Sequence, residues 1–380
     1  MLERYRYPGE FEKRSDVFVT WLPPYIGSDE HDSRQPCVDV IKALVDQVQV
    51  HVNCGEPGAY DEAKERLTAA GVDLDKIIIT HIPDTNFYVR DNGPSVMVDG
   101  KGSRLLVNPN WSYYGVGDPS DPVMVQSRAS GLMMGIGLGI FDVVNSDFVS
   151  EGGDREFNGK GILIAIEDTE VRKRNPGKTR EEVEAEYKRI YNLEKIIWLA
   201  PMLEDDDYRV APLDYKEDGT PIFGMSFAAH ADEMCRFITD NKILLAEITE
   251  EEAAESDMDR ESKKRLDAAY EILSNETDTE GNPFEIVRMP VAKPIELVIG
   301  PDDTDYALYK DSIDVIGGKF MDGTPWPDGP VHFYAATSYC NFLICNGVVL
   351  GQRYWHEGMD EEIRRRDAEA KSVLESCFPD

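Results

Sequence analysis

Three titratable side chains stand at the entrance of a stretch that is otherwise typical of a buried hairpin. His230, Asp232 and Glu233 directly precede two apolar segments, within residues 234–246, that an Asp-Asn turn separates. The alternating pattern and the turn predict two paired strands. Removing ionisable groups from water costs free energy unless partners are supplied. The sequence therefore predicts that these side chains meet partners from elsewhere in the chain.

The same order of features recurs three more times. Each copy has polar residues, a short strand, a turn and a second strand, and the polar clusters are Arg90 to Asn92, Glu151 to Asp154 and Ser338 to Asn341. The turns read DGKG, NGKG and NG. Asn-Gly and Asp-Gly tolerate the positive φ that tight hairpin turns require. Four copies of one unit indicate an internal repeat.

Amphipathic segments between some of the hairpins predict helices that cover them. Apolar residues recur at helical spacing over residues 38–48, 61–70, 181–191 and 360–376. A radial arrangement of these units, with the helices outside, brings the polar clusters to a common axis. The titratable groups would then gather there to meet one ligand.

The chain is strongly acidic, with 40 Lys+Arg against 73 Asp+Glu in 380 residues and a formal net charge of -33. Such a surface repels nucleic-acid phosphates and anionic membranes and attracts cations, although solubility explains the composition equally well. We expect no nucleic-acid partner and no membrane partner. The N-terminal residues lack the apolar core of an export signal, which predicts a cytoplasmic protein.

Cysteine spacing and the longer charged stretches bear on the organisation of the chain. The six cysteines lack CxxC spacing, which argues against a zinc site and a disulfide framework and favours small core residues. Residues 168–225 and 248–330 are charged and contain proline, as expected of insertions. We expect a single domain over residues 1–380 that carries these two insertions.

The polar clusters, in this order and each before a hairpin, resemble those of the guanidino-group deiminases, the family of agmatine deiminases and bacterial peptidylarginine deiminases. The similar segments are FYVRDNGP, EGGDREFNGKG, HADEMCRF and SYCNF, and the first strand, within GEFEKRSDVFVTW, is similar as well. Four motifs in register are a strong signal, whereas EGG or HxD alone is weak. The resemblance implies a pentein-like α/β fold, a five-bladed α/β propeller with the active site on its axis.

The resemblance also implies roles for four residues. A guanidinium is a planar cation with donors around its edge, so two carboxylates can hold it through paired, charge-assisted hydrogen bonds. Asp91 and Asp232 match the two guanidinium-binding aspartates of the family. His230 matches the residue that donates a proton to departing ammonia and later accepts one from water, and Glu151 would orient it or tune its pKa.

Each assignment has a structural alternative. Asp91 would cap a turn, His230 would be a core histidine, and Glu151 would bond its own Gly-rich turn. Trp21 either walls the pocket or fills the core beside the first strand, and Asn341 either positions substrate or bonds the backbone. The family chemistry implies no metal and no organic cofactor.

The sequence departs from the family at the nucleophile. The deiminases attack the guanidinium carbon with a cysteine thiolate from a Gly-Gly-x-x-His-Cys motif and form a thiouronium. This motif is absent from the 380 residues. Three explanations stay open: a sequence truncated before the last strand and the motif, a guanidinium-binding protein without catalysis, or a surrogate such as Cys340, which is otherwise a core thiol.

The expected function is hydrolysis of a guanidinium group to a ureido product and ammonia. The substrate would be agmatine, as in putrescine biosynthesis, or arginine or peptidyl-arginine, and a homo-oligomer is compatible with the sequence. The alternatives are a non-catalytic guanidinium-binding protein and an amidinotransferase, which shares the fold and the cysteine chemistry.

Overall fold

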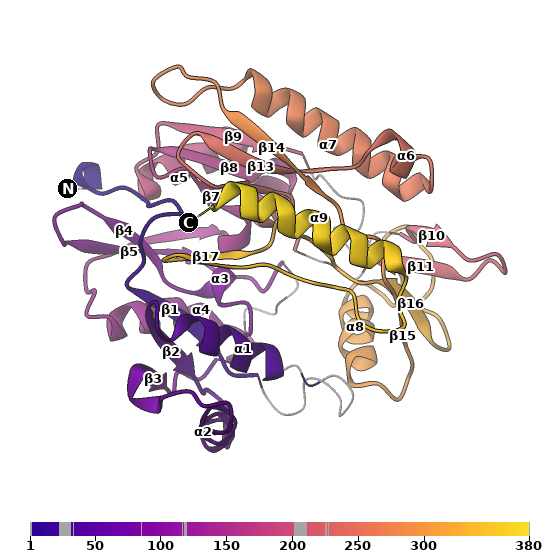
Figure 1. Ribbon diagram of the computed structural model, residues 1–380, viewed down its shortest axis with the longest axis horizontal. Helices are drawn as coiled ribbons and strands as arrows, with labels where there is room; N and C mark the ends of the chain where they lie inside the picture. Colours follow the sequence, from indigo (N-terminus) through magenta and orange to yellow (C-terminus); the bar gives the residue numbers. More distant parts are fainter. Residues whose placement is uncertain are drawn as a thin grey trace.

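The computed structural model describes residues 2–22, 32, 34–84, 86–115, 117, 120–200, 211–224, 226 and 228–379. Among the described strands, three sheets are built to one plan (Figure 1). Two strands form an antiparallel hairpin, and a third strand pairs in parallel with the second. The sheets consist of β4 (Ser95–Val98), β5 (Arg104–Asn110) and β6 (Val143–Val149); β7 (Glu156–Phe157), β8 (Ile162–Ile166) and β9 (Lys195–Leu199); and β12 (Cys235–Phe237), β13 (Lys242–Glu247) and β14 (Glu285–Pro290).

Helices make the crossovers that a parallel third strand requires. They are α4 (Pro122–Gly137) between β5 and β6; η4 (Asp168–Lys173) and α5 (Arg180–Tyr191) between β8 and β9; and α6 (Glu250–Ala253) and α7 (Asp257–Asn275) between β13 and β14. Local sequence sets where they begin. Thr179 and Thr249 each form a capping box with a glutamate three residues later, and the Asp121 side chain caps α4 ahead of a proline.

The first sheet and the last hairpin pack on each other. β1 (Asp16–Thr20), β2 (Gln49–Asn53) and β3 (Ile77–Thr80) are parallel, with α1 (Arg34–Leu44) and α2 (Ala59–Ala69) between them. The hairpin of β17 (Leu343–Cys345) and β18 (Val348–Leu350) shares the apolar core of that sheet, and α9 (Glu361–Cys377) follows it. The remaining short helices are η1 (Leu2–Arg4), η2 (Leu74–Lys76), α3 (Val89–Asn92), η3 (Gly152–Asp154) and η6 (Ala231–Glu233).

The two ranges expected as insertions contribute to the sheets. Residues 168–225 contain α5 and β9, and residues 248–330 contain α7 and β14, which complete two of the repeated units because each parallel strand needs a crossover. Within the first range, residues 201–210 and 225 lie outside the described part of the chain.

The rest of these ranges, together with β16 (Val331–Tyr334) directly after the second range, forms a four-stranded sheet. Its strand order is β10 (Asp214–Tyr215), β11 (Pro221–Gly224), β16 and β15 (Glu296–Ile299), with α8 (Thr304–Val315) between β15 and β16. β11 and β16 run parallel, so two segments far apart in sequence lie side by side (Figure 1).

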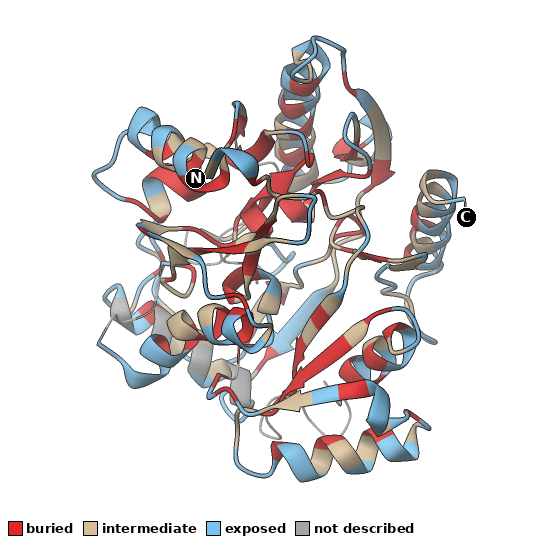
Figure 2. Ribbon diagram, turned by 90° about the vertical axis from the view of Figure 1, so that its left-hand side faces the viewer, coloured by how far each residue is buried: buried red, intermediate tan, exposed pale blue. Residues whose placement is uncertain are grey.

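Apolar side chains of the sheets form the core, and the helices expose their outer sides to solvent (Figure 2). All five residues of β8 are buried, as are four of the six in β13. One core cluster joins β8, β12 and β13 to α7, which places two repeated units against each other. No helix in the described ranges combines the length and apolar character needed to cross a membrane.

Leu244 tests whether β13 is the central strand of its sheet. Its fully buried side chain lies between Arg236 of β12 and Val287 of β14 in the register. We expect Leu244→Ala to lower the free energy of unfolding by about 2 to 5 kcal/mol, because it leaves a cavity in the core. Urea denaturation measures this. Leu297→Ala, at an exposed position of β15, is the control, and equal losses in the two variants would contradict the assignment.

Candidate active site

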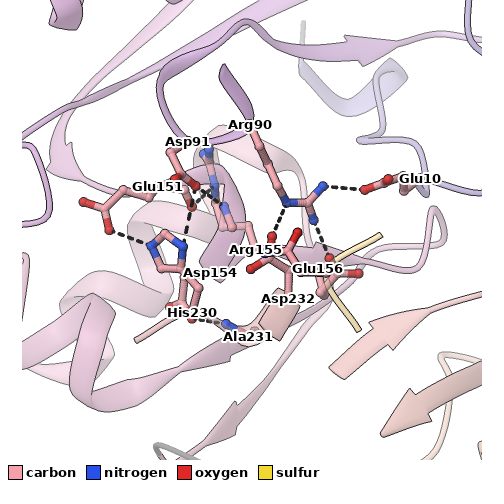
Figure 3. A network of polar contacts seen from close by, with 12 residues as sticks. Glu10, Arg90, Asp91, Glu151, Asp154, Arg155, Glu156, His230, Ala231 and Asp232 are labelled. Carbon is pink, nitrogen blue, oxygen red and sulfur yellow. Dashed lines mark hydrogen bonds and ion pairs between the residues drawn. The ribbon is translucent and has the colours of Figure 1, made fainter. Parts of the chain in front are cut away.

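The polar clusters of three repeated units meet at one place in the structure. Each cluster forms a short helix in front of its hairpin, and α3 contacts η3, which in turn contacts η6. Glu151 and His230 occupy the same position in their units, the extended residue directly before η3 and η6. Figure 3 shows His230 between Glu151 and Asp91, with Asp232 on the neighbouring side. The structure thus brings together four residues that the sequence singled out.

His230 is buried between two carboxylates. Its Nε2 lies 3.2 Å from Oε2 of Glu151, and its Nδ1 lies 3.6 Å from Oδ1 of Asp91. Burial alone would lower the pKa of His230, but the charges of Asp91, Glu151 and Asp232 and the contact with Glu151 raise it to about 10. The imidazole is therefore protonated at neutral pH.

Glu151 is ionised because an arginine is buried with it. Nε of Arg174 donates to both carboxylate oxygens, at 2.8 and 2.6 Å, and Nη2 donates to the carbonyl of Ala228. Burial would raise the pKa of Glu151, but Arg174 and His230 outweigh it, so the pKa is lowered. Arg174 also ties the segment before His230 to this carboxylate.

Asp91 is held by donors from two other segments. Its Oδ1 accepts the backbone N–H of Gly153 at 2.8 Å, and its Oδ2 accepts the hydroxyl of Tyr114 at 2.6 Å. Burial raises the pKa of Asp91, and His230 and Tyr114 partly offset this effect. Tyr113 and Tyr114 have φ of 52° and 59°, in the left-handed region that is unfavourable for side chains of this size. This strained turn delivers the hydroxyl to Asp91.

The two glycines of the EGG motif are required by close approach. A Cβ on Gly152 would lie 1.8 Å from the carbonyl oxygen of Arg90. A Cβ on Gly153 would lie 2.3 Å from Nδ1 of His230, 2.8 Å from Oδ1 of Asp91 and 3.1 Å from Oδ1 of Asp232. Polar atoms from α3, η6 and the residue before η6 therefore border one small space above Gly153.

Asp232 presents one bonded oxygen and one open oxygen. Its Oδ2 lies 2.6 Å from Nε of Arg90. Its Oδ1, the atom next to Gly153, is buried and has no hydrogen-bond partner among the described residues. A buried, unpaired carboxylate oxygen is unfavourable unless a donor fills the position, so this atom marks where a ligand donor would bind.

Behind Asp232 lies a cluster of two arginines and two glutamates. Arg90 pairs with Glu10 and, at 2.5 Å, with Glu156, while Arg236 lies 2.6 Å from Glu10 and 2.9 Å from Glu156 (Figure 3 labels Arg90 and both glutamates). Arg236 is fully buried.

No group of three His, Cys, Asp or Glu side chains in the described residues is arranged to hold a metal ion.

Asp154 ties η3 to η6 beneath His230. Its Oδ1 accepts the N–H of Ala231 at 3.0 Å, and both of its oxygens accept the N–H of Ile166. Burial and the nearby Glu170 raise the pKa of Asp154, and burial raises the pKa of Glu170 to about 7. Asp154 thus bonds the backbone of β8 in its own unit and the backbone of η6 in a second unit.

Trp21 and Asn341 lie apart from the His230 contacts. Trp21 is buried in the core of the first sheet, and its indole N–H donates to Glu62 at 3.3 Å. Of the two roles considered for Trp21, pocket wall or core residue, this position corresponds to the second. Asn341 lies in a turn in which Arg236 donates to the carbonyls of both neighbouring residues, and its side chain is half-buried.

Five of the six cysteines are buried, and Cys377 is partly buried at the end of α9. Cys340 is buried, and burial raises the pKa of its thiol to about 12, although Arg236 opposes the effect. Burial likewise raises the pKa of the other five thiols. The six cysteines of the sequence therefore include no thiolate at neutral pH.

Three contributors to the site were missed in the sequence. Arg90 lies inside the quoted motif FYVRDNGP, directly before Asp91, so its charge was a usable signal. Tyr114 and Arg174 come from loops with no pattern that links them to the clusters. Arg155, which lies in the quoted motif EGGDREFNGKG, is buried and donates to the carbonyl of Glu151 and to Tyr191.

Known proteins resemble the chain over nearly its whole length. The agmatine deiminase of Pseudomonas aeruginosa is 26% identical over 383 residues, which cover 99% of this chain and 88% of that protein. The structure of agmatine deiminase from Enterococcus faecalis matches with a TM-score of 0.72 at 21% identity, covering 100% of this chain and 89% of the other. A substrate-bound C. jejuni agmatine deiminase matches with a TM-score of 0.65 at 15% identity, covering 99% and 88%.

These structures match the mixed α/β fold described above, which confirms the α/β class of the expected fold. The family described as Porphyromonas-type peptidyl-arginine deiminase matches residues 6–213 and 217–380. This match covers almost the entire sequence and includes all four polar clusters. The chain belongs to the Porphyromonas-type peptidyl-arginine deiminase family.

Proposed function

We propose that the protein is a hydrolase that deiminates a guanidino compound, releasing ammonia and leaving a ureido product. One observation carries the proposal: Nδ1 of His230 and single oxygens of Asp91 and Asp232 border the same space above Gly153. Membership of the family and relatives named agmatine deiminase support it. In this reading the guanidinium would bind against these polar atoms.

Charged side chains of both signs lie around this space. Asp91, Asp232 and Glu151 are opposed at short range by His230, Arg90 and Arg174, while Glu10 and Glu156 are shared between Arg90 and Arg236. Arg14 also lies 3.4 Å from Glu10, so five cations face these five carboxylates. A guanidinium would supply the donor that Oδ1 of Asp232 lacks.

His230 is proposed as the proton carrier. Because Asp91 and Glu151 hold it in the protonated form, it enters the reaction ready to protonate departing ammonia, and the neutral imidazole can then accept a proton from water. Glu151 is proposed to orient the ring through Nε2, with Arg174 keeping Glu151 ionised.

The attack on the guanidinium carbon requires a thiolate. In the proposed reaction a thiolate adds to the carbon, ammonia leaves with the proton of His230, and water then displaces the thiolate from the thiouronium to give the ureido product. The raised pKa of Cys340 disfavours it as that group. We assign the described residues to binding and proton transfer; in the family that the sequence resembles, the attacking cysteine lies in a Gly-Gly-x-x-His-Cys motif.

The surroundings of the site favour a substrate without a free carboxylate. In the described part of the chain, Arg90, Arg155, Arg174 and Arg236 all pair with protein groups at or behind the site. Agmatine and peptidyl-arginine fit this environment better than free arginine does. Asn341, half-buried in a turn anchored by Arg236, is proposed to contact the rest of the substrate.

The sheets are proposed to be blades of a five-bladed propeller. Three sheets share one strand order, their polar clusters meet, and the last hairpin packs on the first sheet. Such a ring would form a single domain around the site, with the four-stranded sheet as an addition.

A second candidate function is guanidinium binding without turnover. It is favoured by one specific observation, the raised pKa of all six thiols. The same carboxylates would bind the ligand in that case. The two candidate functions therefore differ only in whether a thiolate attacks the bound guanidinium.

The carboxylates provide the first test of the site. Asp91→Asn and Asp232→Asn should each weaken agmatine binding by about 1.5 to 3 kcal/mol, because each removes a charged hydrogen-bond partner. Isothermal titration calorimetry measures the affinity. Asp240→Asn, at an exposed turn, is the matched control. Unchanged affinity in both site variants, with the fold intact, would refute the assignment.

The environment of His230 predicts a pH dependence of stability. Since its pKa in the folded protein is about 10, above the usual 6.5, its stabilising effect is complete below pH 6.5 and is lost as pH rises through 10. Stability should therefore fall between pH 8 and 10, and the fall should be smaller in His230→Gln than in the control His332→Gln. Urea unfolding across this range tests the difference, and equal slopes would contradict it.

The third test concerns the cysteine nucleophile. The 380-residue chain should bind agmatine but release no ammonia, because none of its cysteines is a thiolate at neutral pH. Adding the Gly-Gly-x-x-His-Cys segment of a relative after residue 380 should produce ammonia release that iodoacetamide abolishes. Ammonia release by the unextended chain that Cys340→Ala abolishes would instead make Cys340 the nucleophile. An extended chain that binds agmatine without turnover would favour the binding-only function.

A further inference from the structure

Arg90 makes a contact that none of the roles above requires. Its Nε lies 2.6 Å from Oδ2 of Asp232, and its two terminal nitrogens pair with Glu10 and Glu156. These three carboxylates come from the N-terminal segment, from β7 and from η6. The guanidinium of Arg90 thus connects three segments and touches a proposed ligand-binding residue directly.

The contact involves one oxygen of Asp232. Arg90 forms an ion pair with Oδ2 at 2.6 Å, while Oδ1 lies next to Gly153 without a hydrogen-bond partner among the described residues. A carboxylate held by one oxygen has little freedom to rotate, so the other oxygen is presented in a fixed direction. Pre-orienting a charged acceptor in this way lowers the cost of ordering it when a ligand binds.

The other two guanidinium nitrogens of Arg90 pair with Glu10 and Glu156, which holds Arg90 in place beside Asp232. Glu156 is buried, and burial and the neighbouring carboxylates raise its pKa while Arg236 and Arg90 lower it. Arg236 also pairs with Glu10 and Glu156. Its Nη1 donates to the carbonyls of Cys340 and Phe342. Arg236 therefore anchors the glutamates to the last hairpin, and Arg90 extends the chain of contacts to Asp232.

Arg90 brings a positive charge to one of two neighbouring carboxylates. Asp91 and Asp232 both face Gly153, and the charge of Asp232 contributes, after burial, to the raised pKa of Asp91. The charged or titratable groups that act on or around Asp232 are Glu10, Arg90, Asp91, Glu156, His230, Arg236 and Cys340. Of the cations in this set, Arg90 alone makes a contact of 2.6 Å with the Asp232 carboxylate among the described ion pairs.

We infer that Arg90 is a positioning residue for guanidinium recognition, which holds the carboxylate of Asp232 so that its free oxygen binds the ligand. The inference rests on the proposed function, since it concerns the same site. It differs from a purely structural role, in which Arg90 would stabilise the fold and leave ligand affinity unchanged.

Two substitutions at Arg90 test this role. Arg90→Gln removes the charge, and Arg90→Lys keeps the charge but cannot contact three carboxylates with a planar group. Calorimetry with agmatine and with benzoyl-arginine amide gives the dissociation constants, and thermal unfolding reports the fold. Arg6→Gln is the matched control, because Arg6 also pairs with a glutamate, Glu12, but outside the site.

The expected result is a loss of affinity of about tenfold or more in Arg90→Gln, a smaller loss in Arg90→Lys and none in Arg6→Gln. The loss in Arg90→Gln should also grow as pH is lowered from 8 to 6, because a buried carboxylate site that has lost a neighbouring cation binds protons more readily. The unmodified chain and Arg90→Lys should show a weaker pH dependence. A structural role alone would not change this profile.

The outcomes separate this inference from the function on which it rests. If the unmodified chain binds neither ligand, the proposed function fails and the inference fails with it. If the unmodified chain binds but folded Arg90→Gln binds equally well with the same pH profile, only the inference is overturned. If Arg90→Gln does not fold, Arg90→Lys decides, because wild-type affinity in that variant would overturn the inference.

Discussion

The pairing of His230 with Glu151 and Asp91 is the interaction on which the rest of the site depends. A buried imidazolium is unfavourable without counter-charge, and its two carboxylate partners come from other repeated units. The three short helices must therefore meet for any of these charges to be stable. The absence of a side chain at Gly153 lets them meet closely enough to leave only a small space between the polar atoms.

Much of the local structure could be predicted from the sequence. Turn residues located the hairpins, and Asn346 and Gly347 have the positive φ that their turn requires. The helix expected at residues 181–191 begins one residue earlier, where a capping box fixes its start. α4 was missed because its apolar residues, exposed as well as buried, follow no clear helical period. Local signals therefore sufficed where periodicity and turn chemistry agreed.

The site was predictable only in part, for a physical reason. Asp91, Glu151, His230 and Asp232 stand at equivalent places in a repeat, and the repeat itself indicated that they meet. Contacts such as Tyr114 with Asp91 and Arg174 with Glu151 depend on tertiary packing that no short motif specifies. The roles of all these side chains stay predictions, whereas membership of the family follows from a match over almost the whole chain.

The four-stranded sheet links the two long charged stretches, residues 168–225 and 248–330, to each other. β11 comes from one stretch and β16 directly follows the other, and they pair in register, with Ile222 beside His332. Each strand also leads, within a few residues, into a polar cluster, at His230 and at Ser338. Insertions or deletions in either stretch would have to preserve this pairing. The two stretches are thus expected to diverge in concert over evolution, as one module attached to two edges of the site.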